Sequence, residues 1–214
     1  MKKRWISRRK NIGAIGIGTM IVFIAMVLVA GIAASVLIQT SSKLQRQAMT
    51  TGQQTTGEVA TGVEVYNVEG HVDGSTIDKL AIIVRARAGS NPIDLSTTVL
   101  QLSNSTIKCV LSYDSSQFAT SPSSSGLFST DVFNLTASEF GIIVLEDADG
   151  SCQNTSPVIN HGDKIALTVN VSAAFGGLPV RTYVWGQVMP EEGAPGIISF
   201  TTPASYVYDV YQLQ

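Results

Sequence analysis

The sequence predicts an α+β protein in which one long hydrophobic helix at the amino end precedes an antiparallel β-sandwich of immunoglobulin-like kind. A run of 25 residues from Ala14 to Ile38 contains no charged residue and no His, Asn, Gln or Pro. After Glu58 the pattern changes to short segments rich in β-branched residues and separated by turn-forming residues. We therefore expect three parts: a basic leader at residues 1–13, a helix at 14–57 and a β-domain at 58–214.

The leader carries much of the positive charge of the chain. Six of the 14 Lys and Arg residues lie in it, and none of the 16 acidic residues does; they are Lys2, Lys3, Arg4, Arg8, Arg9 and Lys10. Without the leader, 8 basic residues face 16 acidic ones, a net charge of -8. Such an acidic body argues against a nucleic-acid partner. Basic residues directly before an apolar helix favour a cytoplasmic amino end and an external body.

The apolar run is long enough to cross a membrane. At about 1.5 Å per residue a helix of this length reaches roughly 37 Å, against about 30 Å for the hydrocarbon core. The pairs Ala30/Ala34 and Gly31/Ser35 place small residues four apart, a spacing that lets helices approach closely. A conventional secretory signal has a shorter apolar region of about 7–15 residues. The simplest alternative is an uncleaved membrane anchor whose small residues face lipid by chance.

Residues 39–56 are polar, yet they retain a helical pattern. The apolar residues that fall at helical spacing are Leu44, Ala48 and Met49. We interpret this stretch as the same helix continuing into solvent and fraying near Gly52 or Gly57. A flexible Ser/Thr/Gln linker is the alternative.

The β-domain is predicted from eight short segments. They span residues 63–72, 80–88, 97–103, 107–113, 140–147, 164–172, 181–189 and 196–200. Alternation of apolar and polar residues at 167–171 and 182–188 is typical of half-buried antiparallel strands. Turn signals occur at 72–75 and at Asp149-Gly150, and the segment from Ser121 to Gly126 is expected to be an exposed loop.

The two cysteines, Cys109 and Cys152, both fall in the expected external domain. A pair in an exported domain favours a disulfide. The closed loop of just over forty residues would stabilise the fold by about 4 kcal/mol in the chain-entropy model. The alternative is two reduced cysteines that act as small hydrophobic residues.

Four Asn-X-Ser/Thr sequences are candidate N-glycosylation sites: Asn104, Asn134, Asn154 and Asn170. Pro157 makes the third a poorer acceptor. Asn170 lies inside a predicted strand, so its side chain must face outward to be modified. We expect modification at one or more of these sites.

No pattern indicates an enzyme or a cofactor. The chain has no GxSxG sequence, and the glycines of the amino end do not follow a strand as a dinucleotide-binding motif requires. Four acidic residues could gather around Ca²⁺, namely Glu146, Asp147, Asp149 and Asp163. The spacing after Asp147 is not that of an EF-hand, so we expect a solvated acidic turn and no metal site. His71 and His161 are expected at the surface.

The amino end resembles the class III signal of archaellins, the archaeal flagellins. The resemblance rests on the basic residues, on Asn11-Ile12-Gly13 and on the unbroken apolar run that begins with Ala14-Ile15-Gly16-Ile17-Gly18-Thr19. It implies that a prepilin-peptidase-like protease cuts between Gly13 and Ala14, so that the helix stays with the mature protein. Type IV pilins generally carry glutamate at the fifth position after the cut, where this chain has Gly18. The match is strong over the first fifty residues and only compatible beyond them.

This resemblance implies a structural subunit that polymerises through the Ala14–Ile38 helix into the archaeal motility filament, the archaellum. Its partners would be further copies of the chain, the protease and an ATP-driven membrane motor. The subunit would lie in the cytoplasmic membrane before assembly and in a filament on the cell surface afterwards. Two alternatives remain: an archaeal adhesion pilin, and a monomeric membrane-anchored binding module that keeps residues 1–13.

Overall fold

A computed structural model describes the backbone of residues 4–214, and it describes side chains at residue 13 and from residue 15 onward. The six basic residues of the expected leader lie outside these described side chains. The chain divides into two compact units, Met1–Gln53 and Gln54–Gln214.

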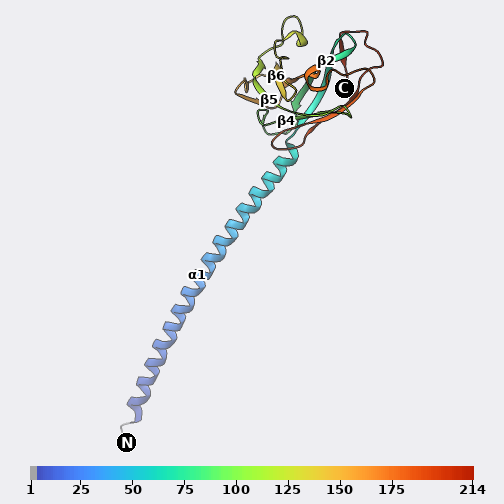
Figure 1. Ribbon diagram of the computed structural model, residues 1–214. Coiled ribbons are helices and arrows are strands. Elements are labelled where there is room, and N and C mark those ends of the chain that lie inside the picture. Colours follow the sequence, from blue (N-terminus) through green and yellow to red (C-terminus); the bar gives the residue numbers. More distant parts are fainter. Residues whose placement is uncertain (1–3) are drawn as a thin grey trace. The chain divides into compact units, whose positions relative to one another are not determined.

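Helix α1 spans Arg4–Ala60 and takes up the whole amino-terminal part of the described chain (Figure 1). The expected fraying near Gly52 or Gly57 is wrong, and the polar stretch at 39–56 is helical rather than a linker. Hydroxyl groups of the polar stretch bond within the helix: Thr40 Oγ1 donates to the carbonyl of Val36 at 2.8 Å, and Thr50 Oγ1 to that of Arg46 at 3.0 Å. Such bonds let Ser and Thr remain in a helix.

The second unit holds twelve strands and two short helical segments. The strands are β1 (Val63–Asp73), β2 (Thr76–Ala86), β3 (Ile93–Asp94), β4 (Val99–Ser103), β5 (Lys108–Ala119), β6 (Glu139–Glu146), β7 (Cys152–Gln153), β8 (Ser156–Ile159), β9 (Lys164–Asn170), β10 (Tyr183–Met189), β11 (Gly196–Thr201) and β12 (Val210–Gln212); the helical segments are η1 (Leu127–Ser129) and α2 (Val171–Phe175). Each of the eight predicted segments overlaps one of these strands, although β2 and β5 extend well beyond their segments.

Nine strands follow one another in the order β11-β10-β4-β5-β6-β9-β2-β1-β12, and β3, β8 and β7 form a smaller sheet. Strand β5 joins two halves of the large sheet, because Lys108–Leu111 pair with β4 whereas its later residues pair with β6. The β5–β6 pairing is parallel, and the other strand pairs are antiparallel. The predicted fold class, a long helix followed by a mostly antiparallel β-domain, is confirmed.

The main core lies between the two halves of the large sheet. Leu102 on β4 and Val184 on β10 are fully buried in the same cluster as Leu80 on β2 and Leu167 on β9. The faces of the two halves therefore pack against each other as the layers of a sandwich. Apolar residues at every second position of β10 and β11 produce this burial, which alternates along both strands.

A second, smaller core lies on the outer side of the β6-β9-β2 half. Ile83, Ile143 and Ala166 point away from the main core and are covered by Phe128 and Phe133 from the segment between β5 and β6. This covering segment had no strand or helix pattern in the sequence. It makes one half of the sheet buried on both faces, and it leaves the β4-β10-β11 half without such a cover.

Candidate functional site

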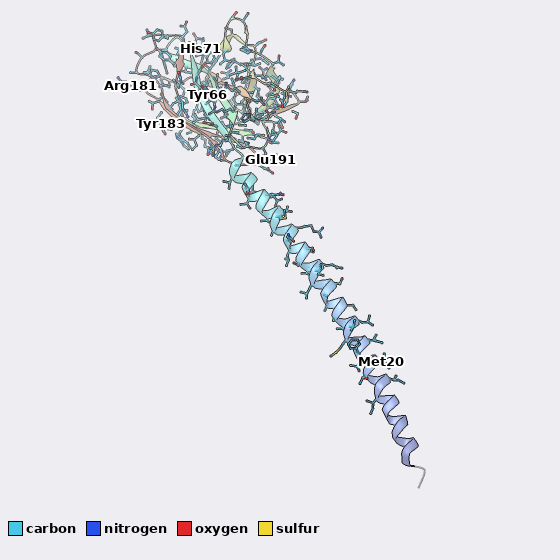
Figure 2. The ribbon with its side chains drawn as sticks, turned by 180° about the vertical axis from the view of Figure 1, so that it is seen from behind. Met20, Tyr66, His71, Arg181, Tyr183 and Glu191 are labelled. Carbon is cyan, nitrogen blue, oxygen red and sulfur yellow. The ribbon has the colours of Figure 1, made fainter. Side chains whose placement is uncertain are left out.

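The surface of α1 is the most unusual chemical feature of the described chain. Fifteen large apolar residues between Ile15 and Ile38 are each more than half exposed: Ile15, Ile17, Met20, Ile21, Val22, Phe23, Ile24, Met26, Val27, Leu28, Val29, Ile32, Val36, Leu37 and Ile38. Figure 2 shows side chains projecting from this part of the helix, with Met20 labelled. Removing one such side chain from water stabilises an assembly by about 1.5–3 kcal/mol.

The apolar surface extends around the whole helix. Ile21, Val22, Phe23 and Ile24 are four consecutive exposed apolar residues, and four residues cover more than one full turn. The hydroxyl of Thr19 donates to the carbonyl of Gly16 at 2.9 Å, so this polar group is satisfied within the helix. Among the described residues, this is the one helix long and apolar enough to cross a membrane. A surface of this kind needs lipid or other helices around it.

The expected cleavage site lies within α1. Gly13 is exposed, and a Cβ added there would meet no atom within 4 Å. The side chain of Ala14, on the other side of the expected cut, lies outside those described. The structure thus shows an open position at Gly13.

The four candidate glycosylation sites differ in their solvent exposure and in whether Nδ2, the atom that would carry a glycan, is hydrogen-bonded. Asn134 and Asn154 are exposed, and Asn154 accepts a hydrogen bond from the hydroxyl of Tyr113 at 3.3 Å. Asn104 is half-buried and its Oδ1 accepts from the backbone N–H of Ile107 at 2.8 Å, a bond that leaves the nitrogen unused.

Asn170 has a structural task instead. Its Oδ1 accepts from the N–H of Ala173 at 3.1 Å and caps helix α2, and its Nδ2 donates to the carbonyl of Leu135 at 3.2 Å. The nitrogen that would carry a glycan is therefore engaged. Asn170 lies in a strand as predicted, since it is the last residue of β9, and there it also caps α2, a short helix that the sequence did not predict.

Both cysteines are free thiols in the structure. Cys109 is half-buried, and its Sγ lies 3.3 Å from the carbonyl oxygen of Ala174. Cys152 is buried in the main core, and burial, with the charges of Asp147 and Asp163, raises its pKa to about 12. This arrangement contradicts the expected disulfide and corresponds to the alternative of two small, reduced core residues.

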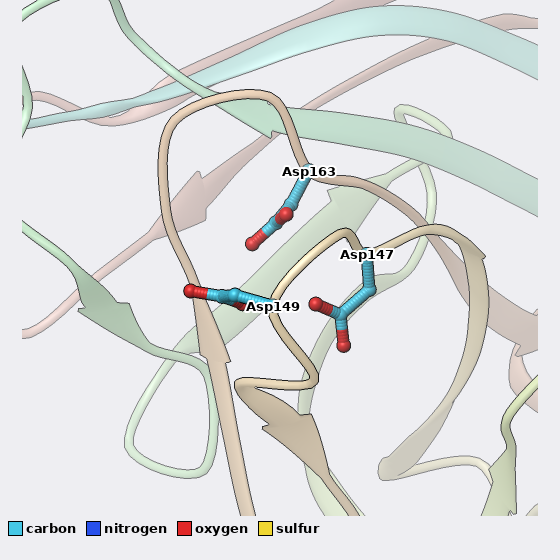
Figure 3. Close-up of side chains that lie close together, drawn as sticks. All are labelled: Asp147, Asp149 and Asp163. Atoms are coloured by element: carbon cyan, nitrogen blue, oxygen red, sulfur yellow. The ribbon is translucent and has the colours of Figure 1, made fainter.

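Three acidic side chains come together where the turn after β6 meets the start of β9 (Figure 3). One carboxylate oxygen from each of Asp147, Asp149 and Asp163 lies within 4.8 Å of the others, a grouping that could hold a hard cation. Glu146 does not join them, because it pairs with Lys164 Nζ at 2.6 Å.

The three carboxylates sit in different surroundings. Asp163 is almost fully buried, and burial raises its pKa although its Oδ2 accepts from the N–H of Asn160 at 2.8 Å. Asp149 is exposed, and hydrogen bonds from Ser151 lower its pKa. The expected solvated turn is thus correct for Asp149 and wrong for Asp163. The burial of Asp163 was not expected from the sequence, because an acidic residue in a turn directly before a strand is ordinarily exposed.

Neither histidine belongs to the group of three carboxylates. His161 is exposed as expected, whereas His71 is half-buried and its Nδ1 lies 2.7 Å from Asp78 Oδ1 across the β1–β2 hairpin. The ring of His71 also lies 5.5 Å from that of Phe128. His71 is thus part of the fold rather than a free surface group.

Comparison with known proteins gives a consistent result over nearly the whole chain. The family model of archaeal-type flagellin matches residues 13–200. Flagellin B2 of Methanocaldococcus jannaschii is 50% identical over 206 residues, which cover 94% of this chain and 95% of that protein.

Two solved structures share the fold. The crystal structure of archaeal flagellin FlaB1 from Methanocaldococcus jannaschii has a TM-score of 0.62 and 40% identity, covering 72% of this chain and 98% of that one. A structure of the archaeal flagellum of Methanospirillum hungatei has a TM-score of 0.59 and 15% identity, covering 92% of this chain and 98% of that one. At that identity the second likeness concerns the fold alone.

Proposed function

Because the chain belongs to the archaeal-type flagellin family, we propose that it is a structural subunit of the archaeal motility filament, assembled through α1. The observation that carries the proposal is the helix surface from Ile15 to Ile38, which is apolar on every side and exposed in the single chain. The relatives named flagellin and the solved archaeal flagellum support a filament as the final state.

The mechanism is physical rather than chemical. In the membrane, lipid surrounds α1 and its backbone hydrogen bonds are satisfied within the helix. Outside the membrane, the same side chains leave water only by packing against α1 of other copies. Small residues such as Gly31 and Ser35 let those helices approach closely. A bundle of α1 helices therefore forms the core of the filament, and the β-domains form its outer wall.

Processing precedes assembly in this proposal. Residues 1–13 hold the amino end in the cytoplasm, and a prepilin-peptidase-like protease cuts between Gly13 and Ala14. Removal of the leader takes away six positive charges that could not enter an apolar core. A membrane motor, which supplies the energy, then adds the subunit to the growing filament. In this proposal the leader is residues 1–13 and the assembly helix begins at Ala14. The expected boundary at 57/58 moves slightly, because α1 continues to Ala60 before the outer domain begins.

The outer domain gives the filament its soluble surface. From residue 61 onward the chain has 6 basic and 15 acidic residues, a net charge of -9. Like charge on neighbouring filaments opposes their association. Glycans on Asn134, Asn154 or Asn104 add to this hydrophilic wall, whereas the bonded nitrogen of Asn170 argues against a glycan there. A wall of this kind needs no catalytic site and no cofactor.

Intact-mass and amino-terminal peptide analysis of filaments sheared from cells tests the proposal. The expected result is a mature end at Ala14, with additional mass on the peptides that contain Asn134 or Asn154. Recovery of the protein only from membranes, with residues 1–13 attached, would contradict it and favour an anchored binding module. Loss of swimming in a deletion strain that still adheres to surfaces would separate the motility filament from an adhesion pilin.

A further inference from the structure

The β-domain carries two exposed apolar surfaces that the rest of this domain leaves uncovered. From residue 61 onward ten large apolar side chains are exposed, and eight of them fall in two groups. The first group is Ile107, Val110, Tyr183, Trp185 and Ile197, and the second is Val207, Tyr208 and Val210.

The first group lies on or beside one face of the sheet. Register places Val110, Gln101, Gln187 and Ile197 side by side across β5, β4, β10 and β11, and it places Lys108, Ser103, Trp185 and Ser199 in the next row. Alternating neighbours such as Leu102 and Val184 point the other way, into the main core. We call the outward residues of these four strands the open face. Tyr183, labelled in Figure 2, extends it along β10.

The outer faces of the two halves of the sheet differ in how far other residues of the domain cover them. The outer face of the β6-β9-β2 half is covered by Phe128 and Phe133. The open face has no comparable aromatic cover: Ser103 in its second row is buried, but Trp185 remains 45% exposed and Ile197 68% exposed. Trp and Tyr on an uncovered face are typical of the centre of a protein interface.

The second group belongs to the C-terminal segment, which we define as residues 206–210, just before and at the start of β12. Val207 is 76% exposed and Tyr208 is 71% exposed. The segment is nevertheless fixed in place, because the hydroxyl of Tyr211 accepts hydrogen bonds from the N–H groups of both residues. An ordered apolar segment loses little conformational freedom when it is bound.

The charges on the two surfaces are complementary. Lys108 is the one charged residue among the two rows of the open face, and Asp209 is the one charged residue of the C-terminal segment. Both are exposed, and neither takes part in an ion pair between described residues. In a domain of net charge -9, a surface without acidic residues is the place where another copy meets least repulsion, and the two rows of the open face contain none.

We propose that the open face of one copy receives the C-terminal segment of the next copy, with Asp209 of the segment facing Lys108. The inference rests on the proposed function, since it adds an outer contact to a filament whose core is α1. The contact is heterologous: each copy offers its open face to one neighbour and its segment to another. Contacts of that kind form rings when the rotation between copies closes and open helical filaments when it does not, and the second case is the one that fits a filament subunit.

A charge exchange tests this contact in cells that make the full-length protein in place of their own copy. The variants Lys108→Asp and Asp209→Lys each place like charges together, and we expect each to lower the filament mass sheared from cells at least threefold. The double variant K108D/D209K restores the opposite pair, and we expect it to return most of the lost mass. Arg87→Asp and Asp131→Lys are matched controls, because they make the same charge changes at exposed residues outside both surfaces.

The outcomes separate this contact from the proposed function. Absence of filaments from cells with the unaltered protein would contradict the filament role itself. Normal filaments from both single variants, or a double variant as poor as the worse single one, would overturn the contact and leave the role of α1 intact. In that case a glycan on Asn104, at the end of β4 beside the open face, becomes the favoured cover.

Crosslinking gives a second, independent measurement. In the full-length chain, Ser199→Cys on the open face is combined with Val207→Cys in the segment, and intact filaments are oxidised. We expect a ladder of dimers, trimers and longer chains in denaturing gels, with no ladder from either single variant. The pair Ser124→Cys and Val207→Cys is the control, because Ser124 is exposed on another loop. Filaments that form but give no ladder would also overturn the contact.

Discussion

Helix α1 and the β-domain place similar apolar residues in opposite surroundings. Ile82 on β2 is completely buried within its own chain, whereas Ile24 on α1 is more than half exposed. The β-domain can bury Ile82 because strands from distant parts of the sequence pack around it. A single helix has no second layer, so its apolar residues find partners only in lipid or in other copies. One chain thus contains a domain stabilised by folding and a helix stabilised by assembly.

A charge in the middle of α1 should produce the largest effect. We expect Leu28→Lys to lower the number of filaments at least a hundredfold, because a lysine in an apolar helix core costs roughly 2.5–3.5 kcal/mol per copy. The measurement is a count of filaments per cell by electron microscopy. Gln47→Lys, in the polar stretch of the same helix, is the control and should retain filaments. Normal filaments from Leu28→Lys would show that this position is not in the core.

Shortening a side chain in the core of the β-domain should lower the stability of that domain, whereas the same change in α1 should not. We expect Ile82→Ala to lower the free energy of unfolding of the β-domain by about 2–5 kcal/mol, because it leaves a cavity in a packed core. Ile24→Ala should leave that value unchanged, because Ile24 is more than half exposed on α1 and belongs to neither core cluster of the β-domain. Denaturant unfolding of the detergent-solubilised full-length protein, followed by Trp185 fluorescence, measures both. Equal effects of the two variants would contradict the division between folding and assembly.

Asn170 offers a smaller, local effect. We expect Asn170→Ala to destabilise the β-domain by about 1–2 kcal/mol, through loss of the α2 cap and of the bond to Leu135. Asn134→Ala removes an exposed side chain and should change stability little. Glycopeptide mass analysis should find sugar at Asn134 or Asn154 and none at Asn170. Sugar on Asn170 in folded filaments would show that its side chain is not held as described.

The acidic cluster should give the smallest effect, a dependence of folding stability on pH. Burial raises the pKa of Asp163 in the folded chain above the unfolded value of 3.8. The folded state therefore holds the proton more tightly, and this contribution to stability is complete below pH 3.8 and is lost as pH rises through the folded pKa.

Asp163→Asn removes this charge, and we expect it to raise the unfolding midpoint slightly at pH 7 in the presence of EDTA, with no change at low pH. Asp149→Asn is the matched control, because the pKa of Asp149 is lowered and neutralising it should not stabilise the fold. A lower midpoint for Asp163→Asn in Ca²⁺, which EDTA abolishes, would instead indicate a bound cation.

The sequence alone determined the features that depend on local pattern. The charge-free run from Ala14 to Ile38 is sufficient to predict an apolar helix, since its length and composition allow no other structure in lipid. Period-two alternation located the strands, because it reflects which side of a strand is buried. The signal around Gly13 also indicated the family by resemblance, before any fold was known.

Tertiary structure decided everything that depends on residues distant in sequence. Strands of two to four residues, such as β3 and β7, exist because neighbouring strands hold them, and so they leave no periodic signal. The burial of Asp163, the capping role of Asn170 and the free thiols at Cys109 and Cys152 each depend on contacts that the fold creates. The open face also arises in this way, because Phe128 and Phe133 cover one half of the sheet and not the other. The sequence specifies the chemical group at each position, but the solvent exposure and the contacts of that group are set only when distant segments pack together.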